Sequence, residues 1–472
     1  MKKNSSLNTR KTGSDRVKKT LANIAEWLHI QKKTDDNPVV TGVSINTRTI
    51  KPGDLFIPFR GEQVNGHRFV QDAFAKGAAA SLWLKDEPDP PKGVPLLFVE
   101  SGEEALQQMA RAYRAELHSV FIGITGSNGK TSTKDLVAGM LSPYFSVKKT
   151  EGNFNNELGL PLTILSLEED TEFAVLEMGM SSFGEIEFLS NLAKPKYVVI
   201  TNIGEAHMQD LGSREGIAKA KFEIIAGLDA AGQLFYDGDE PLLRPFVEKN
   251  PNVQAKSFGV QEQNDLRIAE VNFTEQGSAF RVEGELNETM SIPVLGEHQV
   301  KNTLAALLIG KEVGLTAEQM RKSLKQIVLT DMRMQVIEGV NDAIFINDAY
   351  NAAPTSMLAA ISFLEKSSIK TDKWLVLGDM LELGDNERQY HEDISKSISN
   401  KRFVGVCLYG PRMEWLYNKL VDQFTDEQLI WVNDDTEKLV AFLRNKINDR
   451  SIVLVKGSRG MQLERIIEPF QK

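Results

Sequence analysis

The chain has 472 residues, of which 41% are hydrophobic and 25% charged, and its formal net charge at pH 7 is −10. This composition is typical of globular proteins, and the length predicts about three domains of ~150 residues each. The acidic balance gives no electrostatic footprint for nucleic acid, and no apolar run is long enough for membrane insertion, so neither partner is expected. The single cysteine, Cys407, excludes a disulfide framework and a cysteine-based metal site, and its apolar neighbours predict a buried thiol.

Residues 1–19 form a basic segment. Its charges are Lys2, Lys3, Arg10, Lys11, Arg16, Lys18 and Lys19. No apolar stretch follows them, so the segment lacks the pattern of a secretory signal peptide. We therefore expect a disordered tail on a cytoplasmic protein.

Residues 20–117 predict a small α/β domain. Helical patterns are expected at 20–29, 68–76 and 103–117, with short extended segments and turns between them. A proline-rich loop at 86–93 connects two of these parts.

Residues 118–330 alternate continuous apolar runs with helical patterns. The runs at 120–124, 173–178 and 197–203 predict strands of a mostly parallel sheet that helices cover on both faces. Residues 266–294 alternate differently and predict antiparallel hairpins.

Residues 331–472 repeat the α/β rhythm, with strands expected at 343–348, 374–379, 403–409 and 451–457. The predicted fold class is therefore α/β with three domains. These are a small N-terminal domain at 20–117, a central sheet like that of P-loop ATPases at 118–330, and a doubly wound, Rossmann-like domain at 331–472.

The stretch F-I-G-I-T-G-S-N-G-K-T-S-T at 121–133 has the pattern of a phosphate-binding loop. An apolar run ends in a glycine-flanked turn, which brings Lys130 and Thr131 to the start of a helix predicted at 132–140. Glycines let backbone N–H groups converge on phosphate oxygens, the lysine neutralises phosphate charge, and the threonine hydroxyl can ligate Mg²⁺. Because Ile124 stands where the usual motif has its first glycine, an ordinary strand–turn–helix with a surface lysine remains the alternative.

Polar side chains follow several predicted strands, at the edge where open parallel sheets bind ligands. They are Glu177, Thr201, Asn202, His207, Asp348 and Lys456. Each alone is as consistent with a plain strand terminus as with a site. Together with the phosphate loop they describe a cleft, in which Glu177 and His207 are candidate Mg²⁺ ligands beside Thr131. Histidine is an unusual ligand for Mg²⁺, so a hydrogen-bonding role for His207 stays open.

The helix predicted at 217–225 contains Lys219, Lys221 and Glu223. From the residues alone, the favoured interpretation is a solvated charged face.

Taken together, these segments resemble the Mur ligase family of peptidoglycan synthesis, over about residues 22–470 and in the family's order. The joint set is specific, although each motif alone is weak. The motifs are G-S-N-G-K-T at 126–131, E-M-G-M at 177–180, T-N-I-G-E-A-H at 201–207, A-K-A-K-F-E at 218–223, G-E-H-Q-V-K-N-T-L-A-A at 296–306, Asp331–Met334, N-D-A-Y-N-A-A-P-T-S-M at 347–357, L-G-D-M-L-E-L-G at 377–384 and L-V-K-G-S-R-G-M at 454–461.

The resemblance implies roles for the loop residues and for the metal site. Gly126, Ser127, Asn128, Gly129, Lys130, Thr131 and Ser132 would hold the ATP phosphates. Thr131 and Glu177 would bind one Mg²⁺, and His207 would bind a second together with a carbamylated lysine. Lys221 aligns best with that lysine and Lys219 less well. Carbamylation turns the cation into an anionic oxygen ligand, which explains a lysine at a metal.

The resemblance also implies residues for the nucleotide and for the UDP substrate. Asn302 resembles the asparagine on the adenine side, and Arg333, Asp348 and Asn351 resemble groups that reach nucleotide from the third domain. In S-I-N-T-R, Ser44, Thr47 and Arg48 resemble the uridine-diphosphate-binding stretch. Two departures stand out: Asn46 replaces an acid that many relatives carry, and Asp237 replaces a more usual asparagine.

The implied activity is an ATP-dependent amide-bond ligase. Asn351, where single-amino-acid ligases carry a histidine, and the motif at 377–384 resemble the branch that adds D-alanyl-D-alanine to UDP-N-acetylmuramoyl-tripeptide. ATP and two Mg²⁺ ions are the implied cofactors, and a monomer is expected. Two alternatives remain: another ligase of this fold, such as a single-amino-acid-adding or folylpolyglutamate enzyme, and more remotely a non-ligase P-loop ATPase. The sequence does not determine whether the tripeptide ends in diaminopimelate or lysine.

Overall fold

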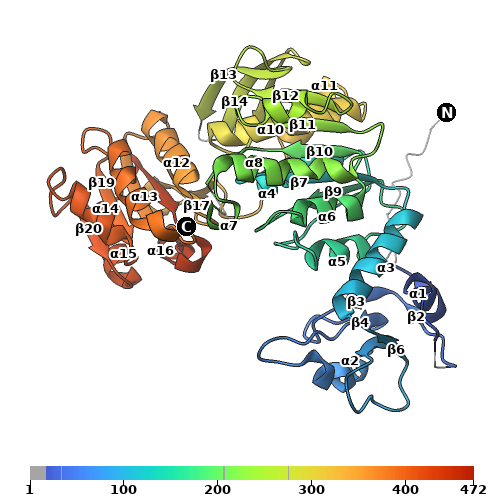
Figure 1. The fold of residues 1–472 in the computed structure, drawn as a ribbon. Coiled ribbons are helices and arrows are strands. Elements are labelled where there is room, and N and C mark those ends of the chain that lie inside the picture. Colours follow the sequence, from blue (N-terminus) through green and yellow to red (C-terminus); the bar gives the residue numbers. More distant parts are fainter. Residues whose placement is uncertain (1–16, 33–34, 206–207, 275) are drawn as a thin grey trace, which may run out of the picture. The chain divides into compact units, whose positions relative to one another are not determined.

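The computed structural model describes residues 17–32, 35–205, 208–274 and 276–472 (Figure 1). Most of the predicted basic tail, and His207, lie outside the described residues. Packing divides the described chain into two compact units. The first contains the described residues up to Phe121 together with Ser146–Ala174 and Asn191–Lys194. The second contains Ile122–Phe145, Val175–Ser190 and Pro195–Lys472.

The first unit contains a parallel sheet of order β3-β4-β5-β6. Its strands are β3 (Gly42–Ser44), β4 (Asp54–Phe56), β5 (Ala80–Leu84) and β6 (Leu96–Val99). A short antiparallel pair, β1 (Lys19–Thr20) and β2 (Val39–Val40), lies apart from it. The helices of this unit are α1 (Leu21–Trp27), the 3-10 turn η1 (Gly66–Phe69), α2 (Val70–Ala75), α3 (Gly102–Glu116) and α5 (Gly159–Leu165).

Local capping explains where these helices begin. Thr20 accepts a hydrogen bond from the backbone of Asn23 and starts α1, and Ser101 does the same for α3 through Glu104. The helix predicted at 20–29 ends earlier, at Trp27, and His29 has a left-handed φ of +53°. The helix predicted at 68–76 is split, because Asn65 caps the 3-10 turn η1 before α2 begins at Val70.

The large sheet has the order β15-β14-β13-β12-β11-β10-β7-β9-β8. Its strands are β7 (Val120–Thr125), β8 (Val147–Lys149), β9 (Phe173–Glu177), β10 (Tyr197–Ile200), β11 (Gln233–Asp237), β12 (Gln254–Gly259), β13 (Leu266–Thr274), β14 (Gly277–Gly284) and β15 (Glu288–Ile292). Pairing is parallel from β7 through β13, and β13, β14 and β15 form antiparallel hairpins. The hairpins predicted at 266–294 are therefore confirmed.

The helices that accompany this sheet carry much of the candidate site. They are α4 (Lys130–Leu141), α6 (Glu185–Ala193), α7 (Met208–Leu211), α8 (Arg214–Phe222), η2 (Glu223–Gly227), α9 (Arg244–Glu248), α10 (Glu297–Glu312) and α11 (Ala317–Leu324). Helix α4 starts two residues before the predicted position, because Gly129 adopts a left-handed φ of +81° as its N-cap.

The C-terminal sheet has the order β16-β17-β21-β18-β19-β20, in which only the β16–β17 pair is antiparallel among the pairings described. Its strands are β16 (Gln335–Glu338), β17 (Ile344–Asp348), β18 (Asp372–Gly378), β19 (Gly405–Tyr409), β20 (Leu429–Val432) and β21 (Ser451–Lys456). Its helices are η3 (Val340–Asp342), α12 (Pro354–Lys366), η4 (Gly384–Asn386), α13 (Glu387–Asp393), η5 (Ile394–Ser397), α14 (Met413–Leu420), α15 (Thr436–Arg444), η6 (Arg459–Met461), α16 (Glu464–Ile467) and η7 (Glu468–Phe470).

Two apolar cores lie on the two faces of the C-terminal sheet. One joins alternate strand residues to α12 and α14, and the other joins the intervening residues, Cys407 included, to α15 and α16. The buried thiol and the doubly wound arrangement were both predicted. The predicted α/β fold class is confirmed, although the strands β16 and β20 were not anticipated.

Candidate active site

The phosphate-loop sequence forms a tight turn between β7 and α4. Gly126 has a φ of +150°, and a Cβ atom there would lie 1.8 Å from the Thr201 hydroxyl oxygen. A Cβ atom on Gly129 would lie 2.9 Å from both amide atoms of Asn302. Both glycines are therefore required by backbone conformation and by close neighbours, as expected for a loop that brings N–H groups together.

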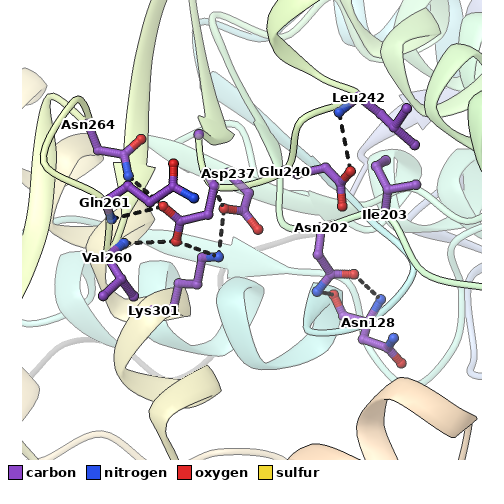
Figure 2. A network of polar contacts seen from close by, with 12 residues as sticks. Asn128, Asn202, Ile203, Asp237, Glu240, Leu242, Val260, Gln261, Asn264 and Lys301 are labelled. Carbon is purple, nitrogen blue, oxygen red and sulfur yellow. Dashed lines mark hydrogen bonds and ion pairs between the residues drawn. The ribbon is translucent and has the colours of Figure 1, made fainter.

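The loop is braced by the segment that follows β10 (Figure 2). The backbone N–H of Asn128 donates to the Asn202 side-chain oxygen at 2.9 Å, and the Asn202 amide donates back to the Asn128 carbonyl at 3.0 Å. The Thr201 hydroxyl donates to the same carbonyl at 2.5 Å. The Ser127 hydroxyl accepts from the Gly204 N–H at 2.8 Å. The polar residues predicted at this strand end thus hold the loop in shape.

Lys130 folds back over the loop. Its ammonium donates to the Gly126 carbonyl at 2.8 Å. Burial lowers the pKa of Lys130, an effect that Glu177 opposes and Arg333 reinforces. Lys130 is half-buried inside the turn, so it is not a freely exposed surface lysine. The next residues, Thr131 and Ser132, are buried in the first turn of α4.

Thr131 connects the loop to two other predicted site residues. Its hydroxyl donates to Glu177 Oε2 at 2.9 Å and accepts from Arg333 Nη2 at 3.1 Å. Glu177 is 4% exposed at the carboxyl end of β9. The Arg333 guanidinium also lies 4.3 Å from the ring centre of Tyr350. A hydroxyl and a carboxylate side by side are the oxygen donors that Mg²⁺ prefers.

Lys221 is buried, and the interpretation of A-K-A-K-F-E as one solvated face is wrong at this residue. Its side chain is 2% exposed, and burial together with the charge of Lys130 lowers its pKa well below the usual value. Apolar residues explain its direction: Ile217, Ala220 and Ile224 are also buried, and this helical spacing includes position 221. The spacing was readable in the sequence.

The neighbours of Lys221 in the motif point elsewhere. Lys219 is exposed and lies 5.5 Å from the ring centre of Phe183. Glu223 accepts from the Gly184 N–H at 2.9 Å, so it holds the loop between Glu177 and α6 and is not the partner of Lys221. A buried amine of lowered pKa is the form that can take up CO₂, which fits the predicted carbamate.

Asn302 and Asp237 lie beside the phosphate loop and the end of β11, respectively. Asn302 is 5% exposed and packs on Gly129. Asp237 pairs with Lys301, at 2.6 Å between Nζ and Oδ1. Burial raises the pKa of Asp237 to about 6 even though Lys301 lowers it. The departure from asparagine at this position is thus accompanied by a lysine partner, which sequence reasoning did not single out.

The predicted third-domain residues gather around Lys456. Its ammonium lies 2.6 Å from Asp348 Oδ2 and donates to the Asn351 carbonyl at 3.0 Å. Asp348 Oδ1 accepts from the Met334 N–H at 3.2 Å, next to Arg333. Asp348 and Asn351 therefore both contact Lys456, and Arg333 is adjacent to them through the backbone of Met334.

Ser44, Thr47 and Arg48 belong to the first unit. Ser44 ends β3 and is buried, whereas Arg48 is exposed. The Asn46 side-chain oxygen accepts from the Arg48 N–H at 2.9 Å, a role that a carboxylate would fill equally well. This explains why the turn tolerates asparagine at position 46.

Among the described residues, no group of three or more His, Cys, Asp or Glu side chains could hold a metal ion by itself. Thr131 and Glu177 offer two oxygen donors, and Mg²⁺ prefers octahedral coordination, so an ion there would take its other oxygens from substrate phosphates or water. Within the same residues, no helix is long and apolar enough to cross a membrane.

Sequence profiles of known families match three parts of the chain. They are the Mur ligase family catalytic domain at residues 39–114, the Mur ligase middle domain at 124–310 and the Mur ligase glutamate ligase domain at 332–459. Among curated proteins, the chain is 44% identical to the UDP-N-acetylmuramoyl-tripeptide--D-alanyl-D-alanine ligase of Bacillus subtilis, with 96% of this chain and 98% of that protein covered.

Two solved structures of MurF ligases are similar to the fold of this chain. MurF from Acinetobacter baumannii superposes with a TM-score of 0.86 at 27% identity, covering 96% of this chain and 99% of that one. MurF ligase from Thermotoga maritima in complex with ADP superposes with a TM-score of 0.79 at 28% identity, covering 90% and 96%.

Proposed function

The chain belongs to the Mur ligase family, and we propose that it joins D-alanyl-D-alanine to UDP-N-acetylmuramoyl-tripeptide in the synthesis of peptidoglycan precursors. It is an ATP-dependent ligase that forms a peptide bond. The observation that carries the assignment is the near-complete coverage of a ligase of this specificity at 44% identity. The match includes the first region, residues 20–117, to which we assign binding of the UDP substrate. A folylpolyglutamate enzyme has no such domain, so this alternative does not account for the first region.

The reaction needs no protein nucleophile. A carboxylate oxygen of the tripeptide attacks the γ-phosphorus of ATP, the bond from that phosphorus to the ADP oxygen breaks, and an acyl phosphate forms. The amine nitrogen of D-alanyl-D-alanine then attacks the acyl carbon. The carbon–oxygen bond to phosphate breaks, the amine loses a proton, and inorganic phosphate leaves. Positioning and charge neutralisation supply the catalysis.

The loop residues Gly126–Thr131, with Ser132, hold the phosphates of ATP. Lys130 offsets the negative charge that develops on the β/γ-bridging oxygen as the phosphoryl group is transferred, and the braced backbone keeps its N–H donors aimed inward. Thr131 and Glu177 would hold one Mg²⁺, and Lys221 as a carbamate would hold a second together with His207. Magnesium, when bound, would offset the negative charge of the reacting carboxylate and phosphate groups.

The remaining predicted residues bind the ends of the substrates. Asn302 lies on the adenine side, and Arg333, Asp348 and Asn351 contact the nucleotide. Ser44, Thr47 and Arg48 bind the uridine diphosphate, for which arginine offers paired N–H donors. We also propose domain boundaries at 20–117, 118–330 and 331–472, each of which contains one matched family profile. A monomer in the cytoplasm completes the proposal.

The test is a product analysis. The protein is incubated with ATP, Mg²⁺, D-alanyl-D-alanine and UDP-N-acetylmuramoyl-tripeptide that ends in either diaminopimelate or lysine, and the product mass is measured. We expect a pentapeptide product with one of the two, and little phosphate release when the dipeptide is omitted. Ligation of a single amino acid would indicate another ligase of the family. Phosphate release that needs no acceptor would indicate a P-loop ATPase of another class.

A further inference from the structure

We propose that Lys301 is a positioning residue of the nucleotide site: it anchors α10 so that Asn302 stays against Gly129 of the phosphate loop. The proposal rests on the proposed function, because it concerns how that site holds ATP. Lys301 precedes Asn302 on α10, and its side chain reaches toward the turn that follows β11 (Figure 2).

Lys301 makes two ion pairs with that turn. Its ammonium lies 2.6 Å from Asp237 Oδ1 and 3.0 Å from Asp239 Oδ2. The lysine side chain is 24% exposed, and those of Asp237 and Asp239 are 6% and 15% exposed. Pairs this sheltered from water are screened less than surface pairs, and removing one partner leaves uncompensated charge.

The turn at 237–239 is itself a fixed anchor. Asp239 accepts from the backbone N–H groups of Val260 and Gln261, at 2.8 and 3.0 Å. It also accepts from the Asn264 amide at 2.7 Å. Between the two acids, Gly238 has no room for a side chain, because a Cβ atom there would lie 1.9 Å from Asn264 Oδ1. Because the turn is held in place by these contacts, the ion pairs with Asp237 and Asp239 also fix the position of the Lys301 ammonium.

The next residue of α10, Asn302, touches the phosphate loop. The Asn302 amide atoms lie only 2.9 Å from where a Cβ atom of Gly129 would be, and Gly129 is the left-handed N-cap of the helix that starts with Lys130. Farther along, α10 is held against α4 by close packing, since a Cβ atom on Gly310 would lie 2.7 Å from the Met140 sulfur. Lys301 thus fixes the N-terminal half of the helix, which is the half that contacts the loop.

The same helix offers a matched control. Lys311, near its C-terminal end, forms an ion pair with Glu285 and also donates to the Glu285 carbonyl at 2.9 Å. Replacing either lysine by methionine removes an ion pair from α10. Only Lys301 lies next to the residue that packs on Gly129.

The experiment measures ADP binding by titration calorimetry on the full chain, with Mg²⁺ and without the other substrates. We expect Lys301→Met to raise the Kd for ADP about 10-fold, the size seen when a group that orients a ligand-binding residue is lost. Lys301→Arg should stay within about twofold of wild type, because arginine keeps the charge and the hydrogen bonds. Lys311→Met should leave the Kd unchanged at a comparable loss of melting temperature.

Equal Kd values for Lys301→Met and wild type, or equal increases in the two methionine variants, would overturn the proposal. Lys301→Gln serves the same comparison should the methionine variant not fold. If the wild-type protein binds neither ADP nor ATP, the proposed function itself fails, and the two failures are thereby distinguished.

Discussion

The phosphate loop and the S-I-N-T-R stretch are both predicted anion-binding segments that follow a buried strand, yet they are built differently. The loop at 126–131 is held by residues far away in sequence: Thr201, Asn202, Glu177 and Asn302. The stretch at 44–48 contains a local turn, in which Ser44 bonds to Asn46 and Asn46 to the Arg48 backbone. Its arginine side chain is exposed.

This difference has a consequence for catalysis. A cross-braced, buried loop keeps its donors fixed while charge moves, and such preorganised groups act mainly on the transition state. An exposed arginine on a local turn contributes binding that is equal in ground state and transition state. Substitutions in the first segment should therefore lower kcat, and substitutions in the second should raise KM.

The largest expected effect is at Lys130. Lys130→Ala removes the charge that the loop presents to the γ-phosphate and should lower kcat by at least ~100-fold, or about 3 kcal/mol. The melting temperature should change little, since the lysine makes its side-chain bond within the turn. Steady-state kinetics and thermal unfolding test both statements. A kcat near wild type with an unchanged melting temperature would contradict the assignment of the loop.

Lys221 extends the comparison to a buried residue that reaches the site from α8. Lys221→Ala should be nearly inactive, because the carbamate that we propose would be lost as a metal ligand. Added short-chain carboxylates should restore part of the activity by occupying the vacated position.

Lys219 provides the control for this experiment. It is exposed over Phe183, and a surface contact of this kind contributes at most about 1 kcal/mol. Lys219→Ala should therefore keep most of the activity and should not respond to carboxylates. If carboxylates restored activity to the Lys219 variant and not to the Lys221 variant, Lys219 would be the carbamylated lysine in place of Lys221.

Arg48 tests the other side of the comparison. Arg48→Ala should raise the KM for the UDP substrate about 10-fold, as expected for one charge-assisted contact, and leave the KM for ATP and kcat nearly unchanged. Asn46→Asp is the matched variant, because it preserves the acceptor for the Arg48 N–H and should change neither constant by much. Equal increases in both KM values would show that Arg48 is structural.

The sequence was most informative where chemistry and position coincide. The apolar runs, the glycine turn and the polar strand ends predicted the three α/β regions and the neighbourhood of Lys130, Thr131 and Glu177. Glycine conformations and strand ends depend on local sequence, so they can be read without a structure.

Side-chain direction and long-range pairing were harder to predict. Lys219 and Lys221 lie two residues apart on one helix. The apolar spacing of that helix includes position 221 on its buried face, but the charged composition of the motif favours a solvated face for both lysines. The pair of Asp237 and Lys301 joins residues 64 positions apart, so neither residue alone indicates the other. The hydrogen bond from Arg333 to Thr131 is also long-range, and no local sequence pattern predicts it.

The last expected effect is on stability and concerns the two acids that share Lys301, whose ionised forms change the free energy of unfolding in opposite directions. Burial raises the pKa of Asp237 to about 6, so the folded protein binds its proton more tightly than the unfolded chain does. Stability therefore falls as pH rises from about 4 to 6, and above that range the ionised carboxylate is a cost. Asp237→Asn removes this cost and should raise the free energy of unfolding by about 1 to 3 kcal/mol at pH 7.5, but much less at pH 4.5.

Asp239 should behave in the opposite way. Backbone donors at Val260 and Gln261, together with Lys301, lower the pKa of Asp239 despite its burial. Its contribution to stability is present above the ordinary aspartate range and is lost as pH falls through the lowered pKa. Asp239→Asn should therefore destabilise the protein at pH 7.5, and the difference from wild type should shrink under acid conditions. Chemical unfolding of both variants at the two pH values checks the prediction. If both variants change the free energy of unfolding in the same direction at pH 7.5, the prediction is wrong. The two carboxylates would then have the same effect on stability in spite of their different burial.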